Sequence, residues 1–281
     1  MSEKKMSAKR VAVVTGSNKG IGYAIVKGLC EKFDGVVYLT ARNIERGQEA
    51  VKKLNGLGFK PEFHQLDVND VPSIDKFRDH IKEKYGGIDV LVNNAAIAFK
   101  NEDTTPFAVQ AEVTVDVNYF GLLRVCKSLF PILKQHARVV NLSSSAGHLF
   151  RIPSAELRQK FADPNLTEEK LSTLMRQFVS DAKEGKHYER GWGNSAYVVS
   201  KVGVSALTFI QQREIKTPGV VVNAVHPGYV DTDMTSHKGP LTIEQGAAAP
   251  LFLALQPVGE NEIKGKYVWC DKKIVDWYKE M

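Results

Sequence analysis

Cysteine is scarce in this sequence, and its three residues lie far apart. Cys30, Cys126 and Cys270 form neither a CxxC pair nor a group of cysteine and histidine at metal-ligand spacing. The first two fall in apolar helical patterns, where a thiol fills a small space in a core. We therefore expect no redox role for these thiols and no bound metal.

Long apolar runs are absent as well. No uncharged apolar stretch approaches the roughly 20 residues that a membrane-spanning helix needs, and the mean hydropathy is −0.23. The N-terminal residues contain no apolar segment of the kind found in secretory signals, so we expect a cytoplasmic protein with reduced thiols. Hydrophobic residues still make up 43% of the 281 residues, which is ample for a packed core.

The net charge of +6 is concentrated at one end of the chain. Four cations and one acid within the first ten residues contribute +3, which leaves +3 for the rest. No basic stripe with interleaved aromatic residues occurs, so a nucleic-acid partner is not expected. Repeats, low-complexity stretches and Gly/Ser linkers are also missing. We interpret residues 1–8 as a flexible basic tail and residues 9–281 as a single domain.

Short β-branched runs alternate with helical stretches along most of the chain. The predicted strands are 11–14, 36–40, 63–66, 89–92, 138–142, 220–224 and 266–270. The predicted helices are 20–32, 45–54, 73–84, 109–133, 195–213 and 242–255. This alternation predicts an α/β fold with a parallel sheet of about seven strands and helices on both faces. Such doubly wound sheets bind ligands at the carboxyl ends of their strands.

Residues 148–190 interrupt the alternation with a helical insertion. Its second helical pattern has one apolar stripe at helical spacing, formed by Leu171, Leu174, Met175, Phe178, Val179 and Ala182. Thr167 is the predicted N-cap of this helix and Gly185 its C-cap. The stripe has to be buried, either against the chain itself or in a dimer interface.

A glycine-rich segment, Thr15-Gly-(x)3-Gly-Ile-Gly22, directly follows the first predicted strand and opens the first predicted helix. Gly16 permits a tight turn, and Gly20 and Gly22 let the helix begin close to the sheet with its free N–H groups facing an anion. A purely structural turn is the alternative, but the position between strand and helix favours a dinucleotide. The predicted cofactor contacts here are Gly16, Ser17, Asn18, Lys19, Gly20, Ile21 and Gly22.

The residues after the second predicted strand indicate which dinucleotide binds. An NAD enzyme usually places a carboxylate there for the ribose 2′-hydroxyl, whereas this chain has Arg42 and no acid before Glu45. Arg42 can hold a 2′-phosphate through two parallel N–H bonds, and Lys19 supplies a second cation. The alternative is that Arg42 and Lys19 are ordinary solvated surface charges. That interpretation would be sound for either residue alone and is weaker for the two together. We predict NADPH/NADP+ as the cofactor.

Tyr197 and Lys201 are four residues apart and share one face of a predicted helix. A free tyrosine has a pKa of about 10, and a fixed ammonium beside it favours the phenolate and lowers that pKa. Tyr197 would then donate a proton to a carbonyl oxygen as hydride reaches the carbon. The YxxxK pattern alone occurs often by chance, so its weight comes from the phosphate loop upstream.

Six segments together resemble the motif series of the short-chain dehydrogenase/reductase family, in that family's order and over nearly the whole chain. They are Thr15-Gly-(x)3-Gly-Ile-Gly22, Asn93-Asn-Ala-Ala96, Asn118, Asn141-Leu-Ser-Ser144, Tyr197-(x)3-Lys201 and Val225-His-Pro-Gly228. The stretches from Gly20 to Val26 and from Tyr85 to Asn94 are similar to the monomeric NADPH-dependent carbonyl reductases. That subgroup reduces ketones, aldehydes and quinones.

The resemblance implies roles for individual residues. Ser144 matches the serine that hydrogen-bonds the substrate carbonyl, with Ser143 and Ser145 as competing candidates, and Asn118 matches the residue that kinks its helix and holds a proton-relay water. Further implied cofactor contacts are Asp67, Val68, Asn94, Pro227, Gly228, Val230 and Thr232. Positions implied or expected to face the substrate are Ile97, Phe99, Gln110, Trp192 and Tyr229, of which Trp192 and Tyr229 could equally belong to the core.

Ser144 and Tyr197 are 197 − 144 = 53 residues apart, whereas most of the family keeps them only about a dozen apart. The insertion accounts for the excess and resembles the feature that sets the monomeric carbonyl reductases apart. We expect it to cover the flank where relatives pack their tetramer helices, so that the protein is a monomer. One departure is that Val225-His226 stand where the subgroup commonly has a cysteine.

These observations predict NADPH-dependent reduction of small-molecule ketones, aldehydes and quinones, with Tyr197 as proton donor. Two alternatives remain open at this point. The same residues would serve a dehydrogenase that oxidises one specific alcohol. A catalytically silent NADPH-binding regulatory protein would have no chemical need for Ser144, Tyr197, Lys201 and Asn118 together.

Overall fold

The computed structural model describes residues 9–100, 102–259 and 263–280. Its centre is a sheet whose order is β3-β2-β1-β4-β5-β6-β7-β8. The strands are β1 (Val11–Val14), β2 (Val36–Ala41), β3 (Glu62–Gln65), β4 (Ile88–Asn93), β5 (Leu133–Leu142), β6 (Val221–Val225), β7 (Tyr267–Val268) and β8 (Ile274–Val275). Strands β1 to β7 pair in parallel, and β8 runs antiparallel to β7. The predicted basic tail at 1–8 lies outside the described residues.

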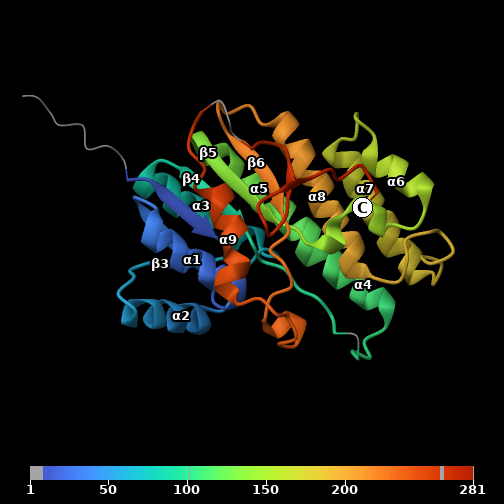
Figure 1. Ribbon diagram of the computed structural model, residues 1–281, viewed down its shortest axis with the longest axis horizontal. Helices are drawn as coiled ribbons and strands as arrows, with labels where there is room; N and C mark the ends of the chain where they lie inside the picture. Colours follow the sequence, from blue (N-terminus) through green and yellow to red (C-terminus); the bar gives the residue numbers. More distant parts are fainter. Residues whose placement is uncertain (1–8, 101, 260–262, 281) are drawn as a thin grey trace, which may run out of the picture.

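Helices cover both faces of the sheet, because its central strands bury side chains on each side. In β1, Val11 and Val13 pack toward one face and Ala12 and Val14 toward the other, and all four are fully buried. The helices are α1 (Gly20–Lys32), α2 (Ile44–Gly56), α3 (Val71–Tyr85), α4 (Phe107–Val115), α5 (Leu122–Leu129), α6 (Ala155–Ala162), α7 (Glu168–Lys183), α8 (Ala196–Glu214) and α9 (Ile243–Ala254). Helices α1 and α9 pack together on one face (Figure 1).

The strand order reverses between β1 and β4, since the chain runs outward to β2 and β3 before it returns to β4. At such a switch point the loops that follow the two strands diverge and leave room for a ligand at the carboxyl edge. The loop after β1 is the glycine-rich segment, and the loop after β4 begins at Asn94. The topology therefore places the predicted phosphate loop where a doubly wound sheet binds its ligand.

Three predicted elements differ from the observed ones. The single helix expected at 109–133 is divided into α4, a π-helical turn at Asp116–Gly121, α5 and a 3₁₀ turn at Phe130–Ile132. Strand β5 begins at Leu133, which pairs with Ile88, five residues before the predicted start. The strand expected at 266–270 shrinks to two residues, and the additional β8 is too short to show a periodic pattern.

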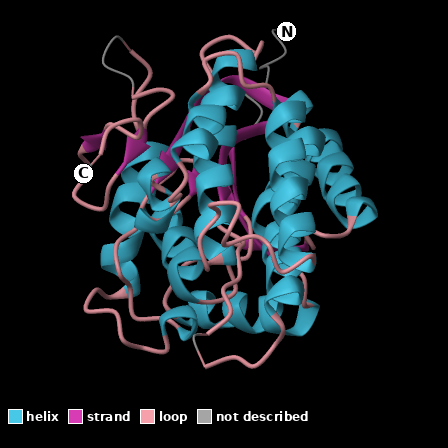
Figure 2. Ribbon diagram, turned by 90° about the vertical axis from the view of Figure 1, so that its right-hand side faces the viewer, coloured by secondary structure: helices cyan, strands magenta, loops and turns pink. Residues whose placement is uncertain are grey.

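The helical insertion is buried against its own chain. Leu171, Met175 and Phe178 have no exposed surface, and α7 packs between α4 and α8. Thr167 caps α7 as predicted by accepting a hydrogen bond from Lys170 N–H. Figure 1 shows α4, α6 and α7 gathered at the side away from β3, and Figure 2, which faces that side, shows helices and loops in front of the strands. The apolar stripe is therefore not an open dimer face.

Two classes of feature are absent from the part of the chain that the structure describes. None of its helices is both long enough and apolar enough to span a membrane. Nor do its histidine, cysteine and acidic side chains gather into a cluster of three that could hold a metal ion.

Candidate active site

The phosphate loop follows β1 and ends where α1 begins at Gly20. Gly16 and Gly20 have φ angles of +60° and +59°, a conformation that strains residues with a side chain. A Cβ on Gly22 would lie 2.4 Å from Asn94 Nδ2. The N-cap Lys19 makes no side-chain cap, and the first turn of α1 contains no acid. The free N–H groups and the helix dipole therefore suit a bound phosphate group.

Two of the predicted cofactor contacts, Asn94 and Ser17, stabilise the conformation of the phosphate loop through hydrogen bonds. Asn94 donates from Nδ2 to the carbonyl oxygens of Thr15 and Gly16, at 3.0 and 2.9 Å. Ser17 is fully buried, with its hydroxyl donating to Val14 O at 2.8 Å and accepting from Thr40 N–H at 3.1 Å. The Ser17 hydroxyl therefore ties the phosphate loop to β2, and a contact between Ser17 and the cofactor stays a prediction.

The two cations expected to hold a 2′-phosphate lie after neighbouring strands, Lys19 in the loop after β1 and Arg42 after β2. Arg42 directly follows β2 and its side chain is exposed. Lys19 pairs at 2.6 Å with Asp233 in the 3₁₀ turn Asp233–Thr235. Lys19 therefore links the loop to that turn in this structure, which the sequence did not indicate.

The other implied cofactor contacts border the same edge of the sheet. Asp67 and Val68 follow β3, and Asp67 Oδ1 accepts a hydrogen bond from Asn69 N–H at 3.0 Å. Thr232 Cγ2 lies 3.5 Å from the Cβ position of Gly20, so the loop after β6 reaches over the phosphate loop. Val230 belongs to the same loop and is buried, and Pro227 and Gly228 connect the loop to β6.

Tyr197 and Lys201 lie on α8, which begins at the N-cap Ser195. Lys201 is buried, and its ammonium donates to the carbonyl oxygen of Leu142 at 2.7 Å and lies 5.7 Å from the centre of the Tyr197 ring. Burial lowers the pKa of Lys201 to about 8. Burial also raises the pKa of Tyr197, and a hydrogen bond with Ser144 lowers it in part. Tyr197 is therefore held in its protonated form. The side chain that lowers the pKa of Tyr197 against the effect of burial is Ser144, not Lys201.

The structure separates the three serines after β5. Ser143 is buried, and its hydroxyl bonds to Ser205 Oγ at 2.7 Å, away from Tyr197. Ser144 is the serine whose side chain lowers the pKa of Tyr197 in part, and its hydroxyl accepts from Ala146 N–H at 3.2 Å. Ser145 begins the following 3₁₀ turn, Ser145–Gly147. Ser144 is thus the serine placed to share a carbonyl oxygen with Tyr197.

Asn118 lies in the π-helical turn between α4 and α5. Its side chain accepts from Ile97 N–H at 2.8 Å and donates to Ile97 O at 2.9 Å and to Ser200 Oγ at 3.0 Å. A small cavity of about 10 Å³ borders Asn118 and Lys201. That volume is close to what one water molecule needs. Asn118 is therefore not an ordinary helix position, because it anchors the loop after β4 to the helix and to α8.

The residues expected to face the substrate divide into two groups. Ile97 and Phe99 are partly exposed in the loop after β4, and Tyr229 is 51% exposed in the loop after β6. Gln110 is partly exposed on α4 and donates to Thr105 O at 2.8 Å. Trp192 is only 1% exposed, and its indole N–H donates to Asp181 at 2.7 Å while its ring packs on Phe178. Of the two alternatives left open for Trp192, pocket wall or core, the structure agrees with the core, where Trp192 packs beneath the insertion.

Sequence reasoning missed Tyr267, whose hydroxyl donates to the carbonyl oxygen of Ser144 at 2.5 Å. Tyr267 lies on β7 and is almost fully buried. The only signal in the sequence is an aromatic residue in a short apolar strand, and this is indistinguishable from ordinary core. The two residues are 123 positions apart in the sequence, so the contact depends on the order of strands in the sheet.

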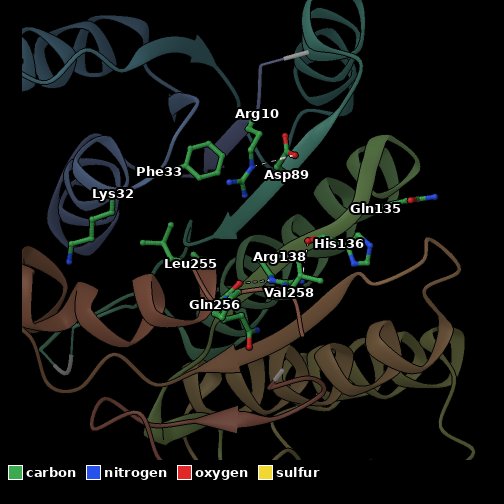
Figure 3. Close-up of a pocket in the computed structure, with 12 residues that line it drawn as sticks. Arg10, Lys32, Phe33, Asp89, Gln135, His136, Arg138, Leu255, Gln256 and Val258 are labelled. Carbon is green, nitrogen blue, oxygen red and sulfur yellow. Dashed lines mark hydrogen bonds and ion pairs between the residues drawn. The ribbon is translucent and has the colours of Figure 1, made fainter. Parts of the chain in front are cut away.

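A cavity of about 410 Å³ opens elsewhere, around residues that precede or begin the central strands. Figure 3 shows Arg10 beside Asp89 and Arg138 beside Gln256 in its walls. The first pair is an ion pair at 3.8 Å, and in the second the guanidinium donates to a backbone carbonyl at 3.0 Å. This cavity contains none of the predicted site residues. We place the chemistry at the carboxyl edge, where the phosphate loop and Tyr197 are.

Comparisons with known proteins agree with this arrangement. The family model described as short chain dehydrogenase matches residues 10–155 and 186–240, and the interruption covers α6 and α7. The chain is 50% identical over 278 residues to rat carbonyl reductase [NADPH] 1, covering 97% of this chain and 100% of that protein. It is 47% identical over 276 residues to the human protein of the same name, covering 96% and 99%. Its structure resembles that of salutaridine reductase from Papaver somniferum, with a TM-score of 0.85 and 32% identity over 92% of this chain and 99% of that one.

Proposed function

The chain belongs to the short-chain dehydrogenase family, and on this basis we propose that it is an NADPH-dependent carbonyl reductase with Tyr197 as its proton donor. The observation that carries the proposal is the meeting of Ser144 and Lys201 at Tyr197, at the sheet edge that also holds the phosphate loop. The similarity to proteins named carbonyl reductase [NADPH] supports both the reaction and the cofactor.

The phosphate loop fits a dinucleotide, because the turn at Gly16 and the uncapped start of α1 leave space and N–H groups for its phosphates. Arg42 would hold the 2′-phosphate, and the loop with Val230 and Thr232 would cover the nicotinamide half. When bound, NADPH supplies the hydride. The remaining steps belong to the residues of this chain.

Ser144 and Tyr197 would both donate hydrogen bonds to the oxygen of the substrate carbonyl, where negative charge develops as the carbon is reduced. Tyr197 then transfers its proton to that oxygen. The raised pKa of Tyr197 keeps this proton in place at neutral pH until the oxygen needs it. Lys201 and a water next to Asn118 would return a proton to Tyr197 afterwards, and the small cavity between them supports this relay.

Two competing functions fit less well. A catalytically silent NADPH-binding protein would not need a tyrosine whose pKa a serine side chain lowers and whose ring has a buried lysine beside it. A dehydrogenase of one alcohol uses the same residues, but the predicted choice of NADPH favours reduction. The test is consumption of NADPH and NADH with quinones, dicarbonyls and aromatic aldehydes. NADPH binding without turnover of any of them would contradict the proposal.

Reversing the charge at Arg42 tests the cofactor assignment. Arg42→Asp is expected to lower kcat/KM for NADPH by about 10- to 100-fold, since a charge-assisted bidentate contact contributes about 1.5–3 kcal/mol. The value for NADH should change little or rise, because a carboxylate can bind the ribose 2′-hydroxyl. Lys52→Asp, an exposed charge reversal on α2, is the matched control. An unchanged preference for NADPH in Arg42→Asp would overturn the assignment.

We also propose that the protein is a monomer, because the insertion buries its apolar stripe against α4 and α8 of its own chain. Light scattering should therefore give a mass near 31.2 kDa. The same value is expected over a tenfold range of protein concentration. A mass of two or four chains would contradict this interpretation of the insertion. Cytoplasmic location and the organisation as one domain stay predictions of the sequence.

A further inference from the structure

The carbonyl oxygen of Ser144 accepts two hydrogen bonds, one local and one from a distant strand. Gly147 N–H donates at 2.8 Å as the 3₁₀ turn Ser145–Gly147 closes, and the Tyr267 hydroxyl donates at 2.5 Å. A carbonyl oxygen has two lone pairs, and both are engaged here. The peptide plane that follows Ser144 is therefore fixed, and this restricts the direction in which the Ser144 side chain leaves the backbone.

The end of the chain holds the same turn at two further points. The indole N–H of Trp277 donates to Gly147 O at 2.6 Å, and the ring of His148 bonds to Asp276 O at 3.3 Å. Trp277 is only 2% exposed, and its ring packs edge-on against Phe209 of α8. We call Tyr267, Asp276 and Trp277 together the C-terminal clamp.

Helix α8 also packs against the turn. A Cβ on Gly147 would lie 2.2 Å from Ser143 Oγ and 2.7 Å from the carbonyl oxygen of Lys201. Because no side chain fits at this position, the turn lies directly on the backbone of α8. Because both α8 and the C-terminal clamp hold it, the turn Ser145–Gly147 and the Ser144 that precedes it have little freedom to shift relative to Tyr197 and Lys201.

Tyr267 is suited to act as a permanent donor. It is 1% exposed, and burial raises the pKa of its hydroxyl well above the ordinary value. A further, smaller cause is the charge of Tyr197, which shows that the two hydroxyl groups share one electrostatic environment. The donor to Ser144 O is thus present throughout the pH range in which the enzyme works.

We propose that Tyr267 is a positioning residue for carbonyl reduction, which orients Ser144 through its carbonyl oxygen and so sets the position of the Ser144 side chain relative to Tyr197. Tyr267 does not touch the substrate in this proposal, which rests on the proposed function. The C-terminal clamp, about 125 residues after Ser144 in the sequence, becomes part of the catalytic apparatus.

Tyr267→Phe tests the proposal, since it removes the hydroxyl and keeps the ring. We expect kcat/KM for a carbonyl substrate to fall about tenfold, mostly in kcat, with an unchanged Kd for NADPH. In a Ser144→Ala background the same change should cost less than about twofold, because a residue that acts through Ser144 has nothing left to orient. The basic limb of the pH–rate profile should move to higher pH, since a misplaced Ser144 no longer lowers the pKa of Tyr197.

Tyr278→Phe is the matched control, because Tyr278 is 51% exposed on the same segment, and it should retain wild-type kinetics. Trp277→Phe removes the donor to Gly147 O and provides a second variant, with the same coupling to Ser144 expected, should Tyr267→Phe fold poorly. Full activity in Tyr267→Phe, or equal losses with and without Ser144, would overturn the proposal. Wild-type protein that binds NADPH and reduces no carbonyl would instead refute the proposed function.

Discussion

Tyr197→Phe is expected to lower kcat for carbonyl reduction by about 10³-fold, because proton transfer from a positioned side chain contributes roughly 10²- to 10⁴-fold. The phenyl ring fills the same partly buried space on α8, so the fold and the NADPH site should be retained. The measurement is NADPH oxidation with a quinone substrate, together with NADPH affinity from fluorescence titration. Loss of turnover with unchanged affinity assigns the effect to the proton.

Two variants separate this result from a general effect of mutation. Tyr188→Phe alters a tyrosine that is 65% exposed and should behave like the wild type. Ser144→Ala leaves Tyr197 in place but removes its hydrogen-bond partner, so a smaller loss than in Tyr197→Phe is expected. A Tyr197→Phe protein that keeps full activity would refute the role of proton donor.

Features determined by local sequence were the ones that could be predicted. The turn at Gly16 and the start of α1 at Gly20 are coded within eight residues, by glycines that tolerate positive φ. Tyr197 and Lys201 are brought together by one helical turn of α8. Thr167 likewise acts within three residues, and this cap formed as predicted. The capping box at Thr242, which opens α9, is equally local. The alternation of strands and helices could be predicted for the same reason, because each element is determined by the pattern of neighbouring residues.

Features that depend on tertiary contacts could not be predicted in this way. The family resemblance, not the local sequence, implied the kink at Asn118, where a π-helical turn forms as its side chain bonds Ile97, 21 residues away. Trp192 looked suited to a pocket wall, but its partner Asp181 lies on α7 and draws it into the core. The inward turn of Ser17 requires Thr40 of β2, and the contact between Tyr267 and Ser144 requires β7 beside β6.

Lys201→Met is expected to raise the free energy of unfolding at pH 7 while it abolishes most of the reductase activity. Burial lowers the pKa of Lys201 from 10.5 to about 8, so the folded state carries a charged group that it disfavours. A difference of about 2.5 pKa units corresponds to at most about 3 kcal/mol. Loss of the hydrogen bond to Leu142 O offsets about 1–2 kcal/mol of this. A net gain of about 1–2 kcal/mol follows, as is common when a functional residue is removed from a core.

The pH dependence gives the sign of this effect independently of its size. Below pH 8 both folded and unfolded wild-type chains hold the Lys201 proton, and the folded state bears the full cost of the buried charge. Between pH 8 and 10.5 the unfolded chain binds more protons than the folded one, so this group makes wild-type stability rise with pH. Lys201→Met removes that rise. Urea unfolding should therefore show a smaller gain in the free energy of unfolding, relative to the wild type, at pH 9.5 than at pH 7. Lys170→Met, an exposed lysine on α7, is expected to show no such change between the two pH values. An advantage of Lys201→Met that stays constant with pH, or a loss of stability at pH 7, would show that the buried ammonium is stabilised by contacts other than its hydrogen bond to β5.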